Sequence, residues 1–209
     1  MSVLPWNHRI PVLRVVTPPV TEPLSLAEAK SQIRVEQDVS DEDSYLLLLI
    51  GAAREFCEGR KCYSFVEQTL EYAIDDFPCS GTTIELPRAT PLRSIASVKY
   101  TDSDGTEHTW DASEYSADTS STPGRVVPKY GVAYPSFTPA TRNAVKITYV
   151  CGPPVESPAL PIPSRYKLAM GQLIAHWYLN REATIIGFQH GEKMAISVED
   201  LLAIDQLIW

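Results

Sequence analysis

The sequence lacks any apolar run long enough to cross a membrane. Its longest run, residues 46–50, is about one and a half helical turns, whereas a membrane-spanning helix needs about 20 apolar residues. The first 23 residues contain several prolines and no compact apolar core ending in small residues, so they do not resemble a secretory signal. We therefore expect a chain of cytoplasmic origin that does not insert into membranes.

Cysteine is scarce, and its spacing fits no metal site. The four cysteines show neither a C-x-x-C pair nor the paired Cys/His spacing of zinc sites. They are Cys57, Cys62, Cys79 and Cys151. We interpret them as buried free thiols, and we expect no metal and no cofactor.

Basic residues are outnumbered by acidic ones. The chain has 18 Lys and Arg against 26 Asp and Glu, a formal net charge of −8. This balance argues against a surface that wraps duplex DNA, because nonspecific affinity for phosphates comes from clustered Lys and Arg. It is compatible with a protein that lets DNA pass, since repulsion prevents sticking.

A catalytic constellation is also missing. The four histidines show no HExxH or comparable spacing, and residues 187–191 lack the Lys-Ser/Thr of a phosphate-binding loop. His176 is interpreted as a packed or capping histidine. Consecutive carboxylates at residues 36–43 would point in different directions from a helix and could not converge on one ion. A metal-dependent hydrolase using Asp41, Asp43 or His176 is kept only as a less favoured alternative, and we expect no enzyme.

Three sequence patterns predict helices. Ser25 followed by Glu28 is a capping-box pattern that begins a helix over residues 25–34. A second start at Ser40 predicts a longer helix that runs to about Glu58, with a centre, residues 46–50, that is apolar on every side. Such a centre must be covered on more than one face, either within the chain or by neighbouring subunits. Further helices are expected from Ser164 to about residue 180 and, after a third capping pattern at Ser197 and Asp200, up to Trp209.

The middle of the chain reads as strands. Short β-rich runs separated by turn residues lie at 65–74, 82–86, 95–101, 106–110 and 144–150, and residues 102–105 look like a hairpin turn. Residues 119–142 are expected to be mostly loop because of their Pro and Gly content. The predicted fold class is α+β: a helical bundle built from the N- and C-terminal segments, with an inserted small antiparallel β region. The expected divisions are an extended N-terminal arm at 1–23, a helical bundle from 24–64 and 160–209, and a β-rich insertion at 65–159.

A series of short motifs runs through the chain in a fixed order. In chain order they are LSLAEAK at 24–30, DED at 41–43, IGAAREFCE at 50–58, EQT at 67–69, IELPR at 84–88, PL at 91–92, SVKY at 97–100, PGR at 123–125 and AHWYLNREA at 175–183. Their order and spacing resemble the head-tail connector, or adaptor, family of tailed double-stranded DNA bacteriophages and prophages, in a longer form with a β-rich insertion.

The resemblance implies a structural protein of the virion, made in the host cytoplasm and located at the head-tail interface. Such a protein would form a homo-oligomeric ring below the portal protein, twelvefold by the portal's symmetry, and extend the channel through which DNA passes. Its other face would offer a docking surface for a head-completion or tail-terminator protein. The alternative outside this class is a monomeric protein-binding module of the virion.

Six residues are candidates for interfaces in such an assembly. The pairs Arg54-Glu55 and Arg181-Glu182 form either a solvated charged face or an electrostatic seam between copies. Trp177 belongs to the aromatic end of its predicted helix. Trp209 either folds back on the core or docks on a partner.

Overall fold

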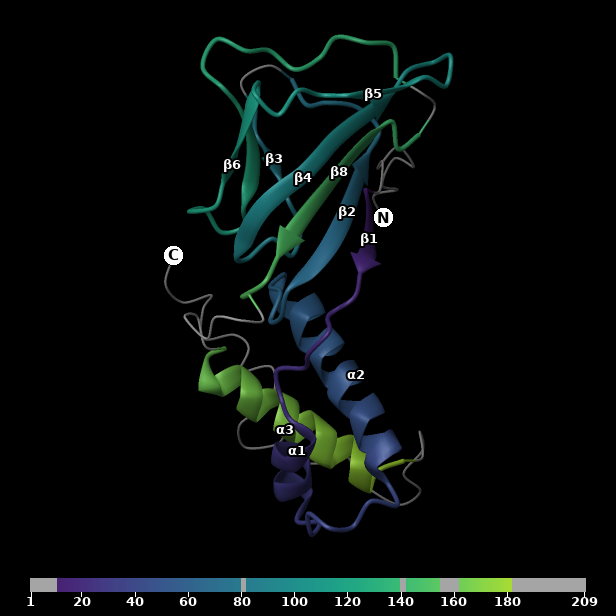
Figure 1. Cartoon of the computed structure of the whole chain (residues 1–209), viewed down its shortest axis with the longest axis vertical. Helices are drawn as coiled ribbons and strands as arrows, with labels where there is room; N and C mark the ends of the chain where they lie inside the picture. Colours follow the sequence, from purple (N-terminus) through teal and green to yellow (C-terminus); the bar gives the residue numbers. More distant parts are fainter. Residues whose placement is uncertain (1–10, 80–81, 140–141, 155–161, 182–209) are drawn as a thin grey trace, which may run out of the picture.

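Three helices form a layer beneath a sandwich of two antiparallel sheets (Figure 1). The computed structural model describes residues 11–79, 82–139, 142–154 and 162–181. The two parts have separate apolar cores, one among the helices and one between the sheets. The chain passes between them three times, from β1 to α1, from α2 to β2 and from β8 to α3.

The helices begin and end largely where local chemistry directs them. Helix α1 spans Leu26–Ile33, and the predicted capping box is present, with Glu28 N–H donating to Ser25 Oγ at 3.2 Å. Helix α2 spans Asp43–Lys61; it begins after Glu42 rather than at the expected Ser40 and ends at Cys62, whose φ is 52°. Helix α3 spans Ser164–Leu179. The expected last helix, which ends at Trp209, lies outside the described residues.

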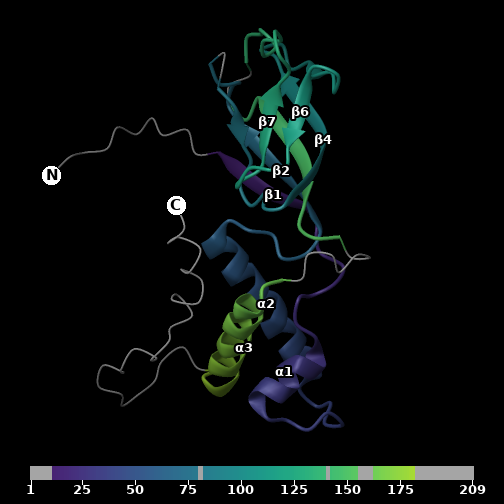
Figure 2. The ribbon, with the colours of Figure 1, turned by 90° about the vertical axis from the view of Figure 1, so that its left-hand side faces the viewer.

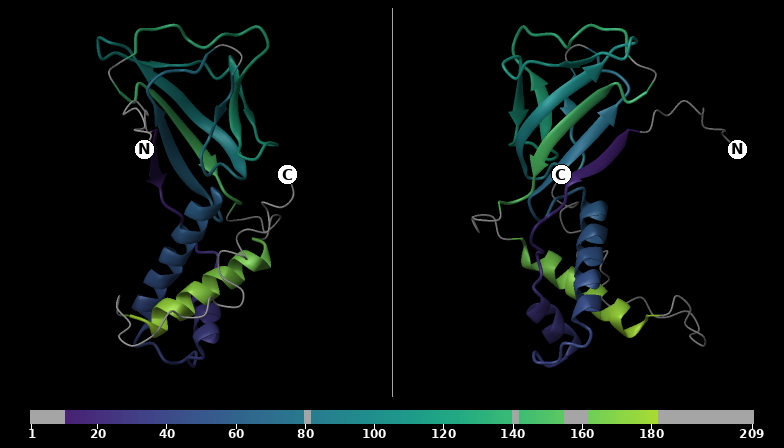
Figure 3. Two further views of the ribbon diagram at one scale, coloured as in Figure 1. Left: turned by 180° about the vertical axis from the view of Figure 1, so that it is seen from behind. Right: turned by 45° about the vertical axis from the view of Figure 1, so that its right-hand side comes forward.

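Helix α3 packs against both α1 and α2, and the views in Figure 3 show it crossing α2 below the sandwich. Fully buried side chains from all three helices fill the space between them, Ala29, Ile50 and Ile174 among them. Phe65, from the segment after α2, stacks on Tyr166 of α3 with ring centroids 4.9 Å apart. Burying each large apolar side chain contributes about 1.5–3 kcal/mol, so this small core is the main source of cohesion in the helical layer.

The larger sheet has five strands in the order β1-β2-β8-β4-β5, all antiparallel. The strands are β1 (Val12–Thr17), β2 (Gln68–Ile74), β8 (Val145–Cys151), β4 (Leu92–Thr101) and β5 (Glu107–Thr109). Burial along β8 alternates strictly, with Ile147 and Tyr149 fully buried on the inner face and their neighbours partly exposed. This period of two is typical of a strand with one face on a core.

The smaller sheet closes the other side of the sandwich (Figure 2). Its order is β3-β7-β6, with β3 at Ile84–Glu85, β7 at Arg125–Pro128 and β6 at Tyr115–Asp118. Val126 at the centre of this sheet and Trp110 beside it are buried against the inner face of the larger sheet. The hairpin predicted at residues 102–105 is confirmed between β4 and β5, where Gly105 has a φ of 83°.

The predicted fold class, a helical bundle with an inserted small antiparallel β region, is wrong. The described residues form eight strands in two antiparallel sheets and three helices, so a helical bundle with a small β insertion does not describe them. The physical reason lies partly in β1: it precedes the helices in sequence, yet pairs with β2 along Val12–Thr17. The larger sheet therefore contains strands from before and after the first two helices in sequence. Strand β6 forms where no element was expected, and the whole of β7 lies within residues 119–142, which were expected to be mostly loop.

Candidate assembly surfaces

Arg54, predicted as a seam residue, is buried in an ion cluster inside the chain. Its side chain is only 8% exposed, and its Nε lies 2.8 Å from Glu22 Oε2. Its Nη1 lies 3.1 Å from Glu58 Oε2, one helical turn further along α2. Burial works to lower the pKa of Arg54, but the bond to Glu22 and the charge of Glu58 outweigh it and raise the pKa overall. Arg54 thus finds its partners within its own chain.

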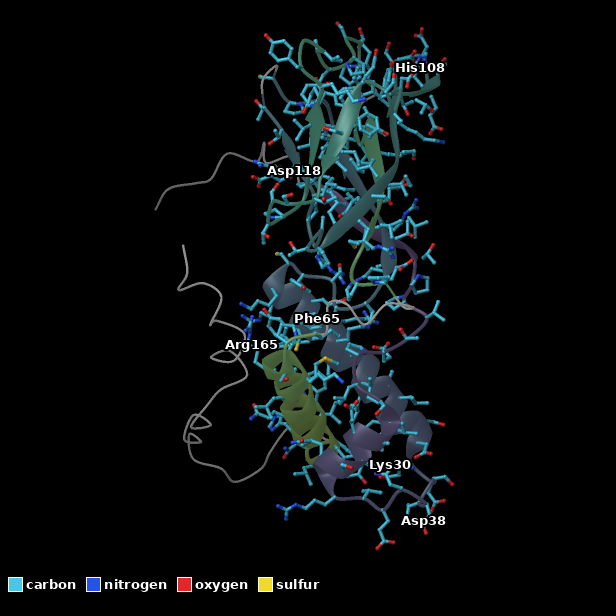
Figure 4. The ribbon with its side chains drawn as sticks, turned by 60° about the vertical axis from the view of Figure 1, so that its left-hand side comes forward. Lys30, Asp38, Phe65, His108, Asp118 and Arg165 are labelled. Atoms are coloured by element: carbon cyan, nitrogen blue, oxygen red, sulfur yellow. The ribbon has the colours of Figure 1, made fainter. Side chains whose placement is uncertain are left out.

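Glu58 is the centre of that cluster and connects the helices to the sandwich. Its side chain is fully buried. Its Oε1 accepts hydrogen bonds from Phe65 N at 2.8 Å and from Gln68 Nε2 of β2 at 3.1 Å. Its Oε2 pairs with Arg88, which follows β3, as well as with Arg54. One carboxylate therefore joins α2, β2 and the segment after β3; Phe65, at this junction, is labelled in Figure 4.

The backbone crosses closely at the same junction. Gly152, just after β8, has a φ of 89°, and a Cβ placed on it would lie 2.0 Å from Val66 O. Only glycine combines this backbone angle with so close an approach. Sequence reasoning assigned no site role to Glu22, Glu58, Arg88 or Gly152, although Glu58 and Arg88 belong to the motifs at 50–58 and 84–88.

The other predicted interface residues are spread over the helical layer. Glu55 is 72% exposed on α2, with its Oε1 3.5 Å from Arg54 Nη2. The Trp177 ring is half-buried and meets Phe56 edge-on at 6.1 Å. Arg181 pairs with Glu42 and lies over the rings of Tyr45 and Tyr178 at 4.7 and 5.0 Å.

Glu182 and Trp209 lie outside the described residues. Of the two expected charge pairs, only Arg54-Glu55 can therefore be located in full, and its arginine faces inward while its glutamate faces solvent.

The residues of the hydrolase alternative do not meet at one point. Asp43 pairs with Lys30 at 2.6 Å, whereas His176 is exposed on α3 and lies next to Asn180, 3.3 Å from its Nδ2. In the part of the chain that the structure describes, no group of three His, Cys, Asp or Glu side chains could hold a metal ion. In the same part, no helix has the length and apolarity needed to cross a membrane.

Exposed leucines mark the outer faces of two helices. Leu47 and Leu48 of α2 are 54% and 67% exposed, although their neighbours Leu46, Leu49 and Ile50 are buried. Leu168 and Leu179 on α3 are also exposed. The apolar centre of α2 is thus covered on one side by this chain, and its other side remains open among the described residues.

A second open surface lies at one side of the sandwich. Strand β1 ends the larger sheet, and three of its valines are about half exposed. A groove of about 530 Å³ lies beside Pro11, the residue before β1, and between the end of β2 and strand β3. Tyr72 and Ile74 supply apolar wall, and Asp76 and Glu85 supply carboxylates.

The fold is similar to that of proteins seen in virus-like particles. No protein-family model matches the sequence, and no curated protein matches it. A chain in the neck of an empty gene transfer agent particle, computed with C6 symmetry, is 22% identical with a TM-score of 0.73, over 92% of this chain and 94% of that one.

Two further structures agree. A chain in the virion of a native gene transfer agent particle is 22% identical with a TM-score of 0.71, over 92% of this chain and 93% of that one. A chain in the neck of the native particle, computed with C12 symmetry, is 21% identical with a TM-score of 0.70 over the same shares. At these identities the likeness establishes the fold: along nearly its whole length, this chain is folded like chains of a particle neck.

Proposed function

We propose that this protein is a structural head-tail connector of a phage-like particle. In this role it forms a ring below the portal protein, extends the DNA channel, and offers a docking surface to a head-completion or tail protein. The observation that carries the proposal is the fold likeness to neck chains over 92% of the sequence. The ordered sequence motifs, which were recognised independently of that likeness, support the same role.

A ring requires two different surfaces on each copy, because neighbours around a cyclic axis meet head to tail. The neck structures that resemble this chain were computed with C6 and C12 symmetry. We assign one of the two surfaces to the outer face of α2, where Leu48 and Glu55, two turns apart, share one side of the helix and are both exposed. An apolar residue beside a charged rim is the usual anatomy of such a contact.

The net charge of −8 supports a channel that DNA crosses without binding. A gel-shift assay with duplex DNA at low salt is therefore expected to show no retained complex. Tight binding that weakens steeply with salt would contradict this part of the proposal.

Mixing the purified chain with the portal protein of the same particle and imaging by electron microscopy tests the ring directly. We expect rings of this chain on one face of the portal. The variant Leu48→Lys should reduce ring occupancy without lowering the melting temperature, because the side chain is 67% exposed. Val20→Lys is the matched control, since Val20 is 87% exposed outside the helices.

Two outcomes would count against the proposal. Failure of the native chain to form a ring with the portal under any condition would contradict the connector function. A chain that binds another virion protein while it stays monomeric with the portal would favour the binding-module alternative. Rings that form equally well with Leu48→Lys would leave the connector in place and remove only the assignment of the α2 face.

A further inference from the structure

The free edge of the larger sheet and the acidic groove beside it form one continuous surface. Pro11, directly before β1, lines the groove, and β1 then runs away from it along the edge of the sheet. In an edge strand, alternate residues direct their N–H and C=O groups outward with no strand to receive them. Strand β1 contains no Lys or Pro, Arg14 is held by Glu71 of β2, and the register shifts only between Val15 and Thr17, so the regular open edge runs from Val12 to Val15.

The groove has chemistry that selects its occupant. Its wall carries the apolar side chains of Tyr72 and Ile74 from the inner face of β2. Asp76 and Glu85 are both exposed on it, and among the described residues neither has a basic partner. An extended segment with apolar side chains and at least one cation would satisfy the open edge, the apolar wall and the two carboxylates together.

We propose that this surface binds an extended segment of a second copy of the chain, namely residues 1–10. That stretch, MSVLPWNHRI, contains Arg9 and His8, several apolar residues and no acidic residue. Ten residues can extend over roughly 33 Å, enough to fill the groove and reach along β1. The basic segment complements the carboxylates of the groove, Asp76 and Glu85, while Arg14 on β1 already pairs with Glu71 at 2.9 Å.

We assign the segment to a neighbouring copy because the four residues directly before β1 are not a favourable turn sequence. To lie antiparallel on the edge of β1, residues before Pro11 would need a tight hairpin at positions 8–11. The residues there, His-Arg-Ile-Pro, include no Gly, Asn or Asp, which tight hairpin turns require. The inference rests on the proposed ring, which places a second copy beside each chain.

A labelled peptide with the sequence of residues 1–10, titrated with the full chain and followed by fluorescence anisotropy, tests the surface. We expect saturable binding that weakens as salt rises. The double variant Asp76→Asn/Glu85→Gln should bind the peptide roughly fivefold more weakly, as expected for two partly exposed ion pairs. A peptide with Arg9→Gln should show a similar loss on the native chain.

The control removes the same two charges elsewhere. Glu36 and Asp38 are exposed in the loop between α1 and α2, and Figure 4 labels Asp38 at the far end of the molecule from the sandwich. The variant Glu36→Gln/Asp38→Asn should bind the peptide as the native chain does. Circular dichroism and melting temperature show whether each variant is folded.

No binding of the peptide, or equal binding by the groove variant and the native chain, would overturn the inference. The peptide titration and the portal imaging can therefore fail independently. Rings on the portal without peptide binding would leave the connector function standing and remove this inference. Peptide binding without any ring on the portal would support the peptide-binding surface and remove the connector function.

Discussion

Neutralising Glu58 should destabilise the chain more than any other single loss of negative charge in the helical layer. In Glu58→Gln the amide oxygen can still accept from Phe65 N and Gln68, but the new NH2 group faces Arg54 and Arg88. Breaking a buried ion pair by removing one partner costs about 3–5 kcal/mol. The low end applies, because Arg54 keeps Glu22 at 2.8 Å and Arg88 retains some contact with water at 17% exposure.

We therefore expect the free energy of unfolding to fall by about 3 kcal/mol in urea titrations. With an unfolding entropy of about 2.1 cal/mol/K per residue, this corresponds to a melting temperature about 7 °C lower. Glu55→Gln, one turn earlier on the same helix and 72% exposed, is the matched control and should change stability by less than about 0.5 kcal/mol. A loss below about 1 kcal/mol in Glu58→Gln would refute the view that this carboxylate holds the two layers together.

Three further predictions test other parts of the structure. Two of the four cysteines should react with a thiol reagent at pH 8 in the native state, and the other two only after unfolding. The reason is that burial raises the pKa of the Cys57 thiol to about 12 and that of the Cys151 thiol to about 11. The reactive pair is Cys62 and Cys79, and the protected pair is Cys57 and Cys151. Gly152→Ala should lower the free energy of unfolding in urea by at least about 2 kcal/mol. Gly105→Ala is the control, because Gly105 has a similar positive φ but no atom within 4 Å of the added Cβ, and it should cost about 1 kcal/mol. Equal losses would contradict the close approach of Gly152 to Val66. The hydrogen bond from Ser25 N and the Lys167 amine lower the folded-state pKa of Glu28. The stabilisation from the Glu28 carboxylate is therefore present above its unfolded-state pKa and is lost as pH falls through its folded-state pKa. Glu28→Gln should cost a few tenths of a kcal/mol at pH 7 by thermal melting, and the difference in stability from the native chain should vanish in acid.

Local signals in the sequence predicted the elements that local chemistry controls. The capping box at Ser25 places the start of α1, and the β-rich runs overlap β2, β3, β4, β5 and β8. The strands that were not predicted are short or are flanked by prolines and glycines, which are typical of loops. Residues 12–17 read VLRVVT, a good strand sequence, but the prolines on both sides hid it. Strand β7 has four residues inside a Pro- and Gly-rich stretch.

The contacts that join the two layers could not be predicted, because they depend on residues far apart in the chain. Glu58 meets Arg88 across 30 positions, and Arg54 meets Glu22 across 32. On a single helix, Arg54 and Glu58 look like an ordinary surface pair at i, i+4. Only the fold brings in the further partners that turn this pair into a buried cluster, so an arginine expected at a seam lies inside.

For the apolar centre of α2, the sequence alone left open whether the chain itself or a neighbouring copy covers its second face. Residues 46–50 were expected to be covered on more than one face, by the chain or by neighbours, and the chain covers only one face. The open face of α2 and the groove at the sandwich lie on different layers, and strand β2 spans about 20 Å between the Glu58 cluster and the groove. Because the Glu58 cluster fixes one layer against the other, a neighbouring copy that uses both surfaces must match both at once. In the proposed ring, loosening the cluster should therefore weaken assembly at temperatures where each layer is still folded, because the buried ion cluster sets the position of one surface relative to the other.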